Sequence, residues 1–325
     1  MAAHAIRFDT TGGPDVLRLT TVEVGDPASN ELRLRHTAIG VNFIDTYHRS
    51  GLYPLSLPSG IGLEAAGMVE AIGSDVVDFA VGDRVGYCWG PVGAYASERL
   101  ITANRVVALP SRVDDETAAA VLLKGCTAEF LAVRCAKVEA GQIVLVHAAA
   151  GGVGLLLVQW LQHIGATVIA TVGRTDKAAL ARDAGAEEII LYRDNDVASA
   201  VADFTNGKGV DVVFDGVGRA TWKASLASLA RRGLLVSYGN ASGPVTGVDL
   251  TILAKHGSVF VTRPTMFDYY TSRAEMLDGS ARLLDLVADG TINVTIGQRM
   301  PLEEAANAHT ALEARETIGS TILIP

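Results

Sequence analysis

Two different patterns of apolar and polar residues divide the chain. Residues 32–41, Leu-Arg-Leu-Arg-His-Thr-Ala-Ile-Gly-Val, begin with strict alternation, which is typical of a half-buried strand. Short apolar runs separated by many glycines continue to about residue 110. This pattern predicts a compact, irregular β-barrel for the N-terminal part.

Strands and helices then alternate between about residue 125 and residue 266. A helix is expected to begin at Asp114, because acidic residues in its first turn precede an apolar run. The β-branched runs that predict strands are Ile143–His147, Thr167–Thr171, Glu188–Leu191, Val210–Asp215, Leu234–Tyr238 and Val259–Thr262. The stretches that predict helices are Val153–Ile164, Asp176–Ala184, Val197–Phe204 and Trp222–Ala230. This order predicts an α/β fold with a doubly wound parallel sheet.

The C-terminal part follows Pro264. Helical patterns cover Ser272–Ala288 and Glu303–Ala314, and strand patterns cover Ile296–Met300 and Ser320–Ile324. A strand that follows a completed six-stranded sheet needs another sheet to join, so we expect the last strand to pair with the N-terminal part. The expected domains are a discontinuous one, residues 1–124 with 267–325, and a nucleotide-binding one, residues 125–266.

The clearest chemical motif is Val-Leu-Val-His-Ala-Ala-Ala-Gly-Gly-Val-Gly, residues 144–154. Ala149, Gly151 and Gly154 occupy the positions of a G-x-G-x-x-G fingerprint, with alanine in place of the first glycine. The motif follows an apolar strand and opens an apolar helix, as dinucleotide binding requires. Gly151 and Gly152 allow the backbone to approach a pyrophosphate, whose charge a helix N-terminus stabilises. A glycine-rich turn that binds no ligand is the plainer alternative.

The end of the next strand bears on which nicotinamide dinucleotide is bound. NAD sites usually carry Asp or Glu there, about 20 residues after the glycines. This chain instead has Gly173 and Arg174, followed by Lys177. Gly173 leaves room and the two cations suit a 2′-phosphate, so we expect NADPH as the cofactor. The alternative is that Arg174 and Lys177 are solvated charges at the start of a helix.

Two further clusters, residues 215–218 and 238–240, follow predicted strands. Ligands of open α/β sheets bind at the carboxyl ends of the strands, so we expect both clusters to border the nicotinamide half of the cofactor. Ordinary turn glycines are the alternative interpretation.

Composition narrows the classes of protein that these motifs allow. Of 325 residues, 49% are hydrophobic and 19% are charged, which argues against disorder. The net charge of −9 disfavours binding to nucleic acid or to an anionic membrane. The chain lacks an apolar N-terminal signal and any apolar stretch of the roughly 20 residues that a membrane helix needs. Its three cysteines have no metal-ligand spacing, and we expect a cytoplasmic protein.

Five further segments are specific in combination. They are Ala-Ile-Gly-Val-Asn-Phe-Ile-Asp-Thr-Tyr (38–47), Arg-Ser-Gly-Leu-Tyr-Pro (49–54), Leu-Lys-Gly (123–125), Arg-Arg-Gly-Leu-Leu-Val-Ser-Tyr-Gly-Asn (231–240) and Val-Thr-Arg-Pro (261–264). With the glycine motif, they resemble the bacterial NADPH:quinone oxidoreductases, the zinc-free, zeta-crystallin-like family of the medium-chain dehydrogenase superfamily. The resemblance covers essentially the whole chain. It implies a GroES-like catalytic domain, a Rossmann domain, an active site in the cleft between them, and a homodimer.

The resemblance also implies which residues contact the cofactor. Asn42 and Tyr47 correspond to residues near the nicotinamide, and Lys124 and Thr127 to residues on its ribose side. The other implied contacts are Gly151, Gly152 and Val153 for the pyrophosphate, Gly173, Lys177 and Tyr192 for the 2′-phosphate, Tyr238, Gly239, Asn240, Val261, Thr262 and Arg263 at strand ends, and Arg315 near the C-terminus. Arg174 joins this set because of its charge.

Zinc-dependent members of the superfamily provide a contrast. At the positions of their zinc-binding Cys and His this chain has Asn42 and Leu63, and we expect no metal site. Without a Lewis acid, alcohol oxidation is disfavoured, whereas a quinone becomes a weakly basic phenolate on reduction. We therefore expect a quinone as the substrate, reduced by hydride or single-electron transfer. The catalytic candidates are Asn42, as a hydrogen-bond donor, and Tyr47 and Tyr53, which would stack on a flat acceptor and donate a proton.

Other interpretations stay open at this point. Reduction of α,β-unsaturated carbonyl compounds needs the same hydride geometry, and a nucleic-acid-binding or structural, crystallin-like role is an alternative of another class. Tyr47 and Tyr53 are alternatively half-buried structural residues. His147 and His36 suggest a general base, but a packed strand residue is the better interpretation of His147.

Overall fold

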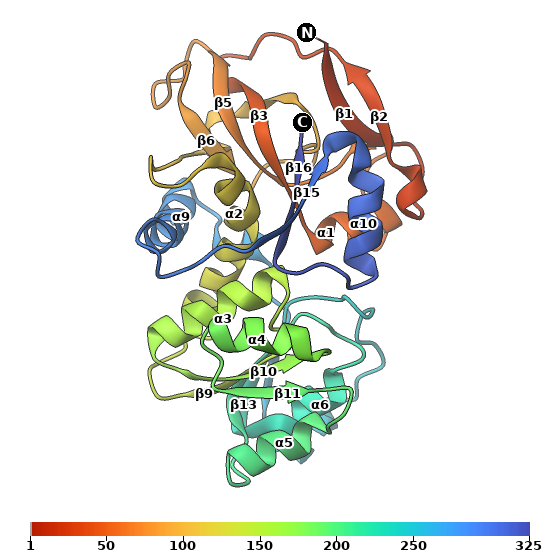
Figure 1. The fold of residues 1–325 in the computed structure, drawn as a ribbon, viewed down its shortest axis with the longest axis vertical. Helices are drawn as coiled ribbons and strands as arrows, with labels where there is room; N and C mark the ends of the chain where they lie inside the picture. The colour runs from red at the N-terminus through yellow and green to blue at the C-terminus, as the bar shows by residue number, and fades with distance from the viewer. Residues whose placement is uncertain (1) are drawn as a thin grey trace. The chain divides into compact units, whose positions relative to one another are not determined.

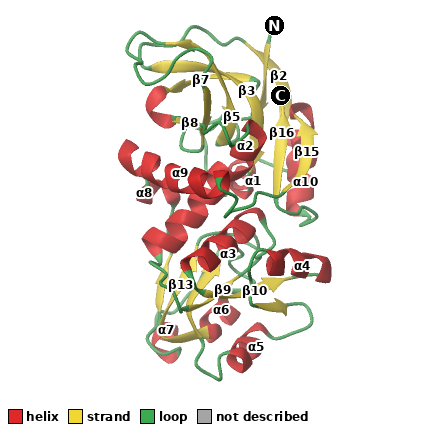
Figure 2. Cartoon of the chain, turned by 60° about the vertical axis from the view of Figure 1, so that its left-hand side comes forward, coloured by secondary structure: helices red, strands yellow, loops and turns green. Residues whose placement is uncertain are grey.

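The computed structural model describes residues 2–325 and divides into two compact units. The first unit comprises the chain up to Cys126 together with residues 272–325, and the second comprises residues 127–271. Figures 1 and 2 show the elements of each unit. In residues 2–325, no helix is both long enough and apolar enough to cross a membrane.

The first unit is rich in β-structure, as the sequence predicted. Its strands are β1 (Ala3–Phe8), β2 (Arg18–Val22), β3 (Glu31–Val41), β4 (Ser59–Gly60), β5 (Glu64–Ile72), β6 (Arg84–Tyr87), β7 (Glu98–Thr102), β8 (Val107–Ala108), β15 (Ile296–Pro301) and β16 (Ser320–Ile324). One sheet has the order β15-β16-β3-β5-β6-β8, with β7 paired to β3, and a smaller sheet has the order β2-β1-β4. Ile322 of β16 lies opposite Gly40 of β3, which confirms that the last strand joins the N-terminal sheet.

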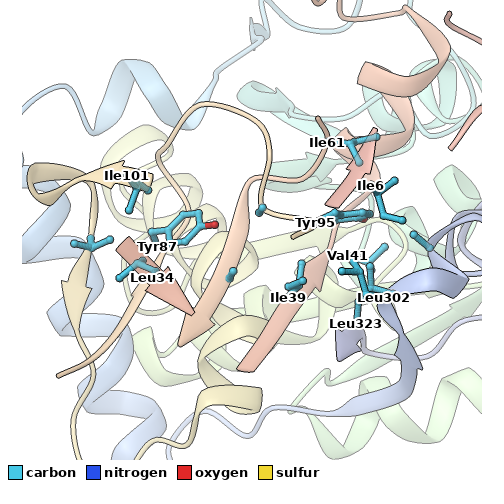
Figure 3. Packing of buried hydrophobic residues seen from close by; sticks show 14 of the residues in the cluster. Ile6, Leu34, Ile39, Val41, Ile61, Tyr87, Tyr95, Ile101, Leu302 and Leu323 are labelled. Carbon is cyan, nitrogen blue, oxygen red and sulfur yellow. The ribbon is translucent and has the colours of Figure 1, made fainter. Parts of the chain in front are cut away.

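Helices and a shared core complete the first unit. The helices are α1 (Phe43–Ser50), α2 (Asp115–Glu129), whose last turn continues into the second unit, α9 (Arg273–Ala288) and α10 (Ala305–Glu313). In β3, Leu32, Leu34 and His36 are buried, whereas Arg35 is exposed, so burial alternates along the start of the strand as predicted. Figure 3 shows Val41 of β3 gathered with Leu323 of β16 and with Leu302 in this core.

The second unit is a Rossmann fold, which confirms the predicted fold class. Its six strands are β9 (Ile143–Val146), β10 (Thr167–Val172), β11 (Glu188–Leu191), β12 (Val210–Asp215), β13 (Leu229–Ser237) and β14 (Phe260–Thr262). They form a parallel sheet in the order β11-β10-β9-β12-β13-β14. The chain therefore builds outwards from β9 in one direction and then from β12 in the other, so the switch point lies between these two strands.

The helices of the second unit cover both faces of its sheet. They are α3 (Gly152–Ile164), α4 (Thr175–Asp183), α5 (Val197–Phe204), α6 (Trp222–Ser228), α7 (Thr251–Lys255) and α8 (Met266–Tyr269). Figure 1 shows α3 and α4 on one face and α5 and α6 on the other. Buried strand residues such as Leu145, Ile169 and Val213 form the core beneath them.

A few elements differ from the predicted ones. The pattern did not predict α1, α7, α8, the π-helical segment η3 (Phe130–Cys135), or the short 3-10 turns η1 (Pro14–Val16) and η2 (Ala103–Arg105). The predicted helix Glu303–Ala314 is observed as the 3-10 turn η4 (Leu302–Glu304) followed by α10. The predicted helix Trp222–Ala230 is wrong at its end, because Leu229 pairs with Val210 of β12 and begins β13. Helix α1 begins directly after β3, where the Asp45 carboxylate accepts a hydrogen bond of 2.9 Å from the Asn42 N–H.

Candidate functional site

The glycine motif forms the turn between β9 and α3. Gly151 is exposed and is the N-cap of α3, and no side chain of the described residues caps this end. The N–H groups of the first helical turn are therefore available to an anion, and the 13-residue helix adds its dipole. A Cβ atom at Gly154 would lie 2.4 Å from the Ala148 carbonyl oxygen, so only glycine allows α3 to approach this turn. The arrangement fits a pyrophosphate.

The predicted 2′-phosphate residues meet at the ends of β10 and β11. Val172 and Leu191 are paired in the sheet, and Gly173 and Tyr192 follow them directly. A Cβ atom at Gly173 would lie 2.6 Å from the Tyr192 hydroxyl oxygen, so the Tyr192 side chain packs directly against Gly173. Lys177 lies in the first turn of α4, where its backbone N–H donates to the Arg174 carbonyl.

Arg174 lies at the same strand end but has a partner within the chain. Its Nε and Nη2 donate to the two carboxylate oxygens of Asp176, at 3.0 and 2.6 Å. These hydrogen bonds lower the pKa of Asp176. Both side chains are about half exposed, at 46% and 53%. A bound phosphate would therefore have to compete with Asp176 for the Arg174 guanidinium.

The remaining residues of the second unit that were predicted to contact the cofactor lie in three places. They follow β13, lie in or directly after β14, or precede η3. A Cβ atom at Gly239 would lie 2.3 Å from the Gly216 carbonyl oxygen, and one at Gly216 would lie 2.8 Å from the Tyr238 ring. Glycine at both positions thus lets the turns after β12 and β13 pack together. Asn240 directly follows Gly239 in the second of these turns. The other predicted residues are Val261 and Thr262 in β14, Arg263 directly after it, and Thr127, whose hydroxyl lies 4.0 Å from the Met266 sulfur.

In the first unit, Asn42 and Lys124 meet at a buried carboxylate that the sequence analysis did not assign a role. Asn42 Nδ2 donates to Glu64 Oε2 at 2.8 Å, and Lys124 Nζ is 3.2 Å from the same oxygen. Glu64 Oε1 accepts the Leu123 N–H at 2.6 Å. All of Glu64 is buried, and a Cβ atom at Gly40 would overlap its carboxylate. Gly40, a glycine near the end of β3, is the feature of the sequence that could have indicated this close packing.

A second buried network lies beside it. Asp45 Oδ2 accepts the Tyr95 hydroxyl at 2.9 Å, and this hydroxyl is 3.1 Å from His309 Nε2. Arg49, also buried, is 3.2 Å from His309 Nδ1 and pairs with Glu313 at 2.7 Å. Burial raises the pKa of Asp45 to about 7, although hydrogen bonds from the Asn42 N–H and the Tyr95 hydroxyl lower it. The network fixes α1, which carries Tyr47, to α10 and to the segment before β7.

The two tyrosines that were predicted to receive a flat acceptor are neighbours. Their ring centroids are 5.1 Å apart and the planes are inclined by 65°. The Tyr53 N–H donates to the Tyr47 carbonyl at 3.1 Å, which fixes the loop after α1. Tyr47 is almost buried and Tyr53 is half-buried, so Tyr53 presents the more accessible ring. Arg315 is exposed after α10, with a positive φ of 61°.

Metal ligands do not gather anywhere in residues 2–325. No group of three or more His, Cys, Asp or Glu side chains in this part of the chain is placed to hold a metal ion. Burial raises the pKa of the Cys88 thiol. Cysteines in residues 2–325 form no disulfide.

Comparisons with known proteins cover the whole chain. Residues 28–140 match the family model for the alcohol dehydrogenase GroES-like domain, and residues 152–282 match the model for zinc-binding dehydrogenases. The chain is 49% identical to a quinone oxidoreductase of Pseudomonas aeruginosa, over 99% of this chain and 100% of that protein. The crystal structure of Escherichia coli quinone oxidoreductase complexed with NADPH is similar with a TM-score of 0.97 and 48% identity, over 99% of this chain and 100% of that chain. A 2-haloacrylate reductase of a Burkholderia species is 44% identical, over 97% of this chain and 96% of that protein.

Proposed function

Because this chain belongs to the quinone oxidoreductase family of the medium-chain dehydrogenases, we propose that it reduces small quinones with NADPH and that it needs no zinc for this reaction. The chain is an oxidoreductase and NADPH is its cofactor. The observation that carries the proposal is the similarity, over the full length, to a quinone oxidoreductase crystallised with NADPH. When bound, NADPH supplies the hydride that reduces the acceptor.

The residues of the second unit hold the phosphates of the cofactor. The N–H groups of Gly152 and Val153 donate to the pyrophosphate, and Gly151, whose own N–H donates to the Ala148 carbonyl, lets the backbone approach it. Lys177 and Arg174 neutralise the 2′-phosphate, next to Gly173 and the Tyr192 side chain that packs against it. The other contacts that we propose in this unit are Thr127, Tyr238, Gly239, Asn240, Val261, Thr262 and Arg263.

The residues of the first unit act on the reacting groups. Asn42 and Tyr47 border the nicotinamide, and Lys124 lies on its ribose side, with Arg315 as a further contact. Since Asn42 Nδ2 is held by Glu64, the amide is fixed before the substrate arrives. Tyr47 and Tyr53 receive a planar quinone, and Tyr53 donates a phenolic proton to the reduced oxygen.

A panel of electron acceptors tests this function. NADPH oxidation should be observed with small quinones, and NADP should not be reduced in the presence of simple alcohols. Tyr53→Ala should raise KM for the quinone by about tenfold, which is the loss of roughly 1.4 kcal/mol of stacking and hydrogen bonding. The same variant should leave the Kd for NADPH within a factor of two or so, because Tyr53 is not placed among the cofactor residues. Quinones that are not reduced would refute the function.

A second candidate function is the reduction of activated carbon–carbon double bonds. It is favoured by the 44% identity to a 2-haloacrylate reductase, since haloacrylates are α,β-unsaturated acids. The same panel decides between the two functions if it includes enones and 2-haloacrylates. Turnover of these compounds without turnover of quinones would make the second function the correct one.

We also propose that the protein is a homodimer in the cytoplasm. Strand β14 lies at one edge of the parallel sheet, and Phe260 and Val261 in it are 61% and 37% exposed. An apolar edge strand is a template for pairing, and a second copy offers an identical edge. A cytoplasmic location agrees with cysteines that form no disulfide in residues 2–325, and cell fractionation tests it.

A further inference from the structure

Four buried polar side chains meet beneath the cofactor loops of the second unit. They are His147 directly after β9, Thr171 near the end of β10, Asp215 at the end of β12, and Ser225 in α6. None is more than 1% exposed. Polar groups are costly to bury without partners, so a cluster of this kind at the switch point of the sheet calls for a physical role.

The distances define a directed chain of hydrogen bonds. Ser225 Oγ donates its proton to Asp215 Oδ2 at 2.7 Å, so it must accept from His147 Nε2, which lies 3.1 Å away. Burial favours the neutral imidazole, and with its proton on Nε2 the Nδ1 atom accepts from the Thr171 hydroxyl, which lies 3.0 Å away. Burial lowers the pKa of His147, while the charge of Asp215 opposes that shift.

The two ends of this series of hydrogen bonds hold three strand-end loops. The proposed function assigns the glycine motif and residues 238–240 to the cofactor, and the sequence predicts that residues 215–218 border its nicotinamide half. The Thr171 carbonyl accepts the N–H of Ala149 in the glycine motif at 3.1 Å. Asp215 Oδ1 accepts the N–H groups of Val217 and Gly218, at 2.8 and 3.0 Å. The Asp215 carbonyl accepts the N–H of Tyr238 at 2.8 Å, at the start of the third loop. Neutral His147 is the link between these anchors, since it bridges β10 and Asp215 from the end of β9.

We propose that His147 is a positioning residue that, through Thr171 on one side and Ser225 and Asp215 on the other, sets the three strand-end loops in the conformation that binds NADPH. The role rests on the proposed function, since the loops matter only if NADPH binds there. His147 is buried and acts through backbone groups, so it takes no part in proton transfer to the substrate. Loss of this series of hydrogen bonds should weaken NADPH binding and leave the quinone site unchanged.

Thr171 allows a test that separates the hydroxyl from the shape of the side chain. Thr171→Val keeps the shape and removes the donor to His147, whereas Thr171→Ser keeps the donor. We expect Thr171→Val to raise the Kd for NADPH by about tenfold, which corresponds to roughly 1.4 kcal/mol. Thr171→Ser should bind nearly as tightly as the wild type. Ser225→Ala removes the hydrogen bonds of the Ser225 hydroxyl to His147 and Asp215, and it should weaken NADPH binding as much as Thr171→Val does.

Thr205→Val is the matched control. Thr205 is buried in the same unit, and its hydroxyl donates to the Val201 carbonyl and accepts the Gly209 N–H, but it precedes β12 at the opposite end of the sheet. This variant should lose stability without losing NADPH affinity. Titration of the full-length protein with NADPH gives the Kd, and amide hydrogen exchange of Ala149, Val217 and Gly218 in the absence of cofactor reports the loops directly.

The outcomes are distinct. Faster exchange at these amides and weaker NADPH binding in Thr171→Val and Ser225→Ala, with KM for the quinone unchanged, support the proposal. NADPH affinities equal to that of Thr205→Val overturn it. A wild-type protein that does not bind NADPH would instead refute the proposed function, whatever the variants do.

Discussion

Gly173 and Lys177 are the two positions that we propose to set the choice of cofactor. Tyr192 packs directly against Gly173, where a side chain would displace it, and Lys177 in the first turn of α4 brings a positive charge. Charge-assisted hydrogen bonds to a phosphate each contribute roughly 1.5–3 kcal/mol. We therefore expect wild-type protein to prefer NADPH over NADH on the order of 10- to 1000-fold, less at high salt.

Two substitutions test this preference. Lys177→Ala should weaken NADPH binding by about tenfold and leave NADH binding nearly unchanged. Gly173→Asp should weaken NADPH binding further, because the carboxylate repels the phosphate and the new Cβ forces Tyr192 to move. Titration of both cofactors at two salt concentrations measures the effect, with Lys208→Ala as an exposed control in the same unit. A loss of equal size for NADPH and NADH in Lys177→Ala would show that this residue does not bind the 2′-phosphate.

Asp45 makes the stability of the first unit depend on pH. Its pKa is about 7 in the folded chain against the ordinary value of 3.8, mainly because of burial. The folded state therefore binds the proton more tightly than the unfolded state, and this contribution to stability is lost as the pH rises from 3.8 through 7. Across this window the free energy of unfolding should fall by up to about 1.4 kcal/mol per pH unit from this group.

Asp45→Asn removes the titrating proton and keeps an oxygen that accepts from Tyr95. Urea denaturation between pH 5 and pH 8, at the same temperature, should show a steeper loss of stability for wild-type protein than for Asp45→Asn. Parallel pH profiles would mean that Asp45 does not change its protonation in this range.

At the scale of elements, β14 carries the prediction about assembly. Phe260 is 61% exposed on this edge strand. Burial of a phenylalanine side chain at an interface contributes roughly 1.5–3 kcal/mol, and a buried lysine would cost more. Phe260→Lys should therefore raise the dissociation constant of the dimer by more than about tenfold.

Sedimentation at several concentrations of wild-type protein and Phe260→Lys measures this constant. Val77→Lys is the control, because Val77 is 89% exposed in the first unit, away from any strand. An unchanged dimer in Phe260→Lys would exclude β14 as the interface, and a monomeric wild-type protein would exclude the homodimer itself.

At the scale of the whole molecule, the question is whether this chain needs a metal, since the medium-chain dehydrogenase superfamily also contains zinc enzymes. The matched model for zinc-binding dehydrogenases covers residues 152–282, whereas the resemblance described in the sequence analysis implies that Asn42 and Leu63 stand where the zinc enzymes have their Cys and His ligands. Beside Asn42, the carboxylate of Glu64 is already paired with the ammonium of Lys124. A further cation there would meet like charge rather than open ligands.

Dialysis against EDTA tests the point. Quinone reduction by the dialysed protein should equal that of the untreated protein, and elemental analysis should find less than one zinc per chain. Stoichiometric zinc whose removal abolishes turnover, and whose return restores it, would contradict the zinc-free assignment.

The sequence by itself determined the six strands of the second unit, its helices α3 to α6 and the class of its ligand. The strand runs and the helix that follows the glycine motif depend on spacings of two and of three to four residues, which are local properties of a strand and a helix. They predicted all six strands of the parallel sheet, with errors of a few residues such as the end of α6 at Ser228. The glycines at 151 and 154 and the missing acid near Gly173 were visible for the same reason, because the turn and the strand end that carry them are each local in the chain.

Only the tertiary structure decided which distant side chains meet. Lys124 and Glu64 are 60 residues apart, and Ser225 and His147 are 78 apart. Such contacts follow from strand register and from how closely elements approach, as at Gly40, where a single Cβ atom would collide with Glu64. His147 illustrates the difference. In the sequence it is one more residue at the end of an apolar strand, and its side-chain partners come from β10 and from α6, which only the folded sheet brings together.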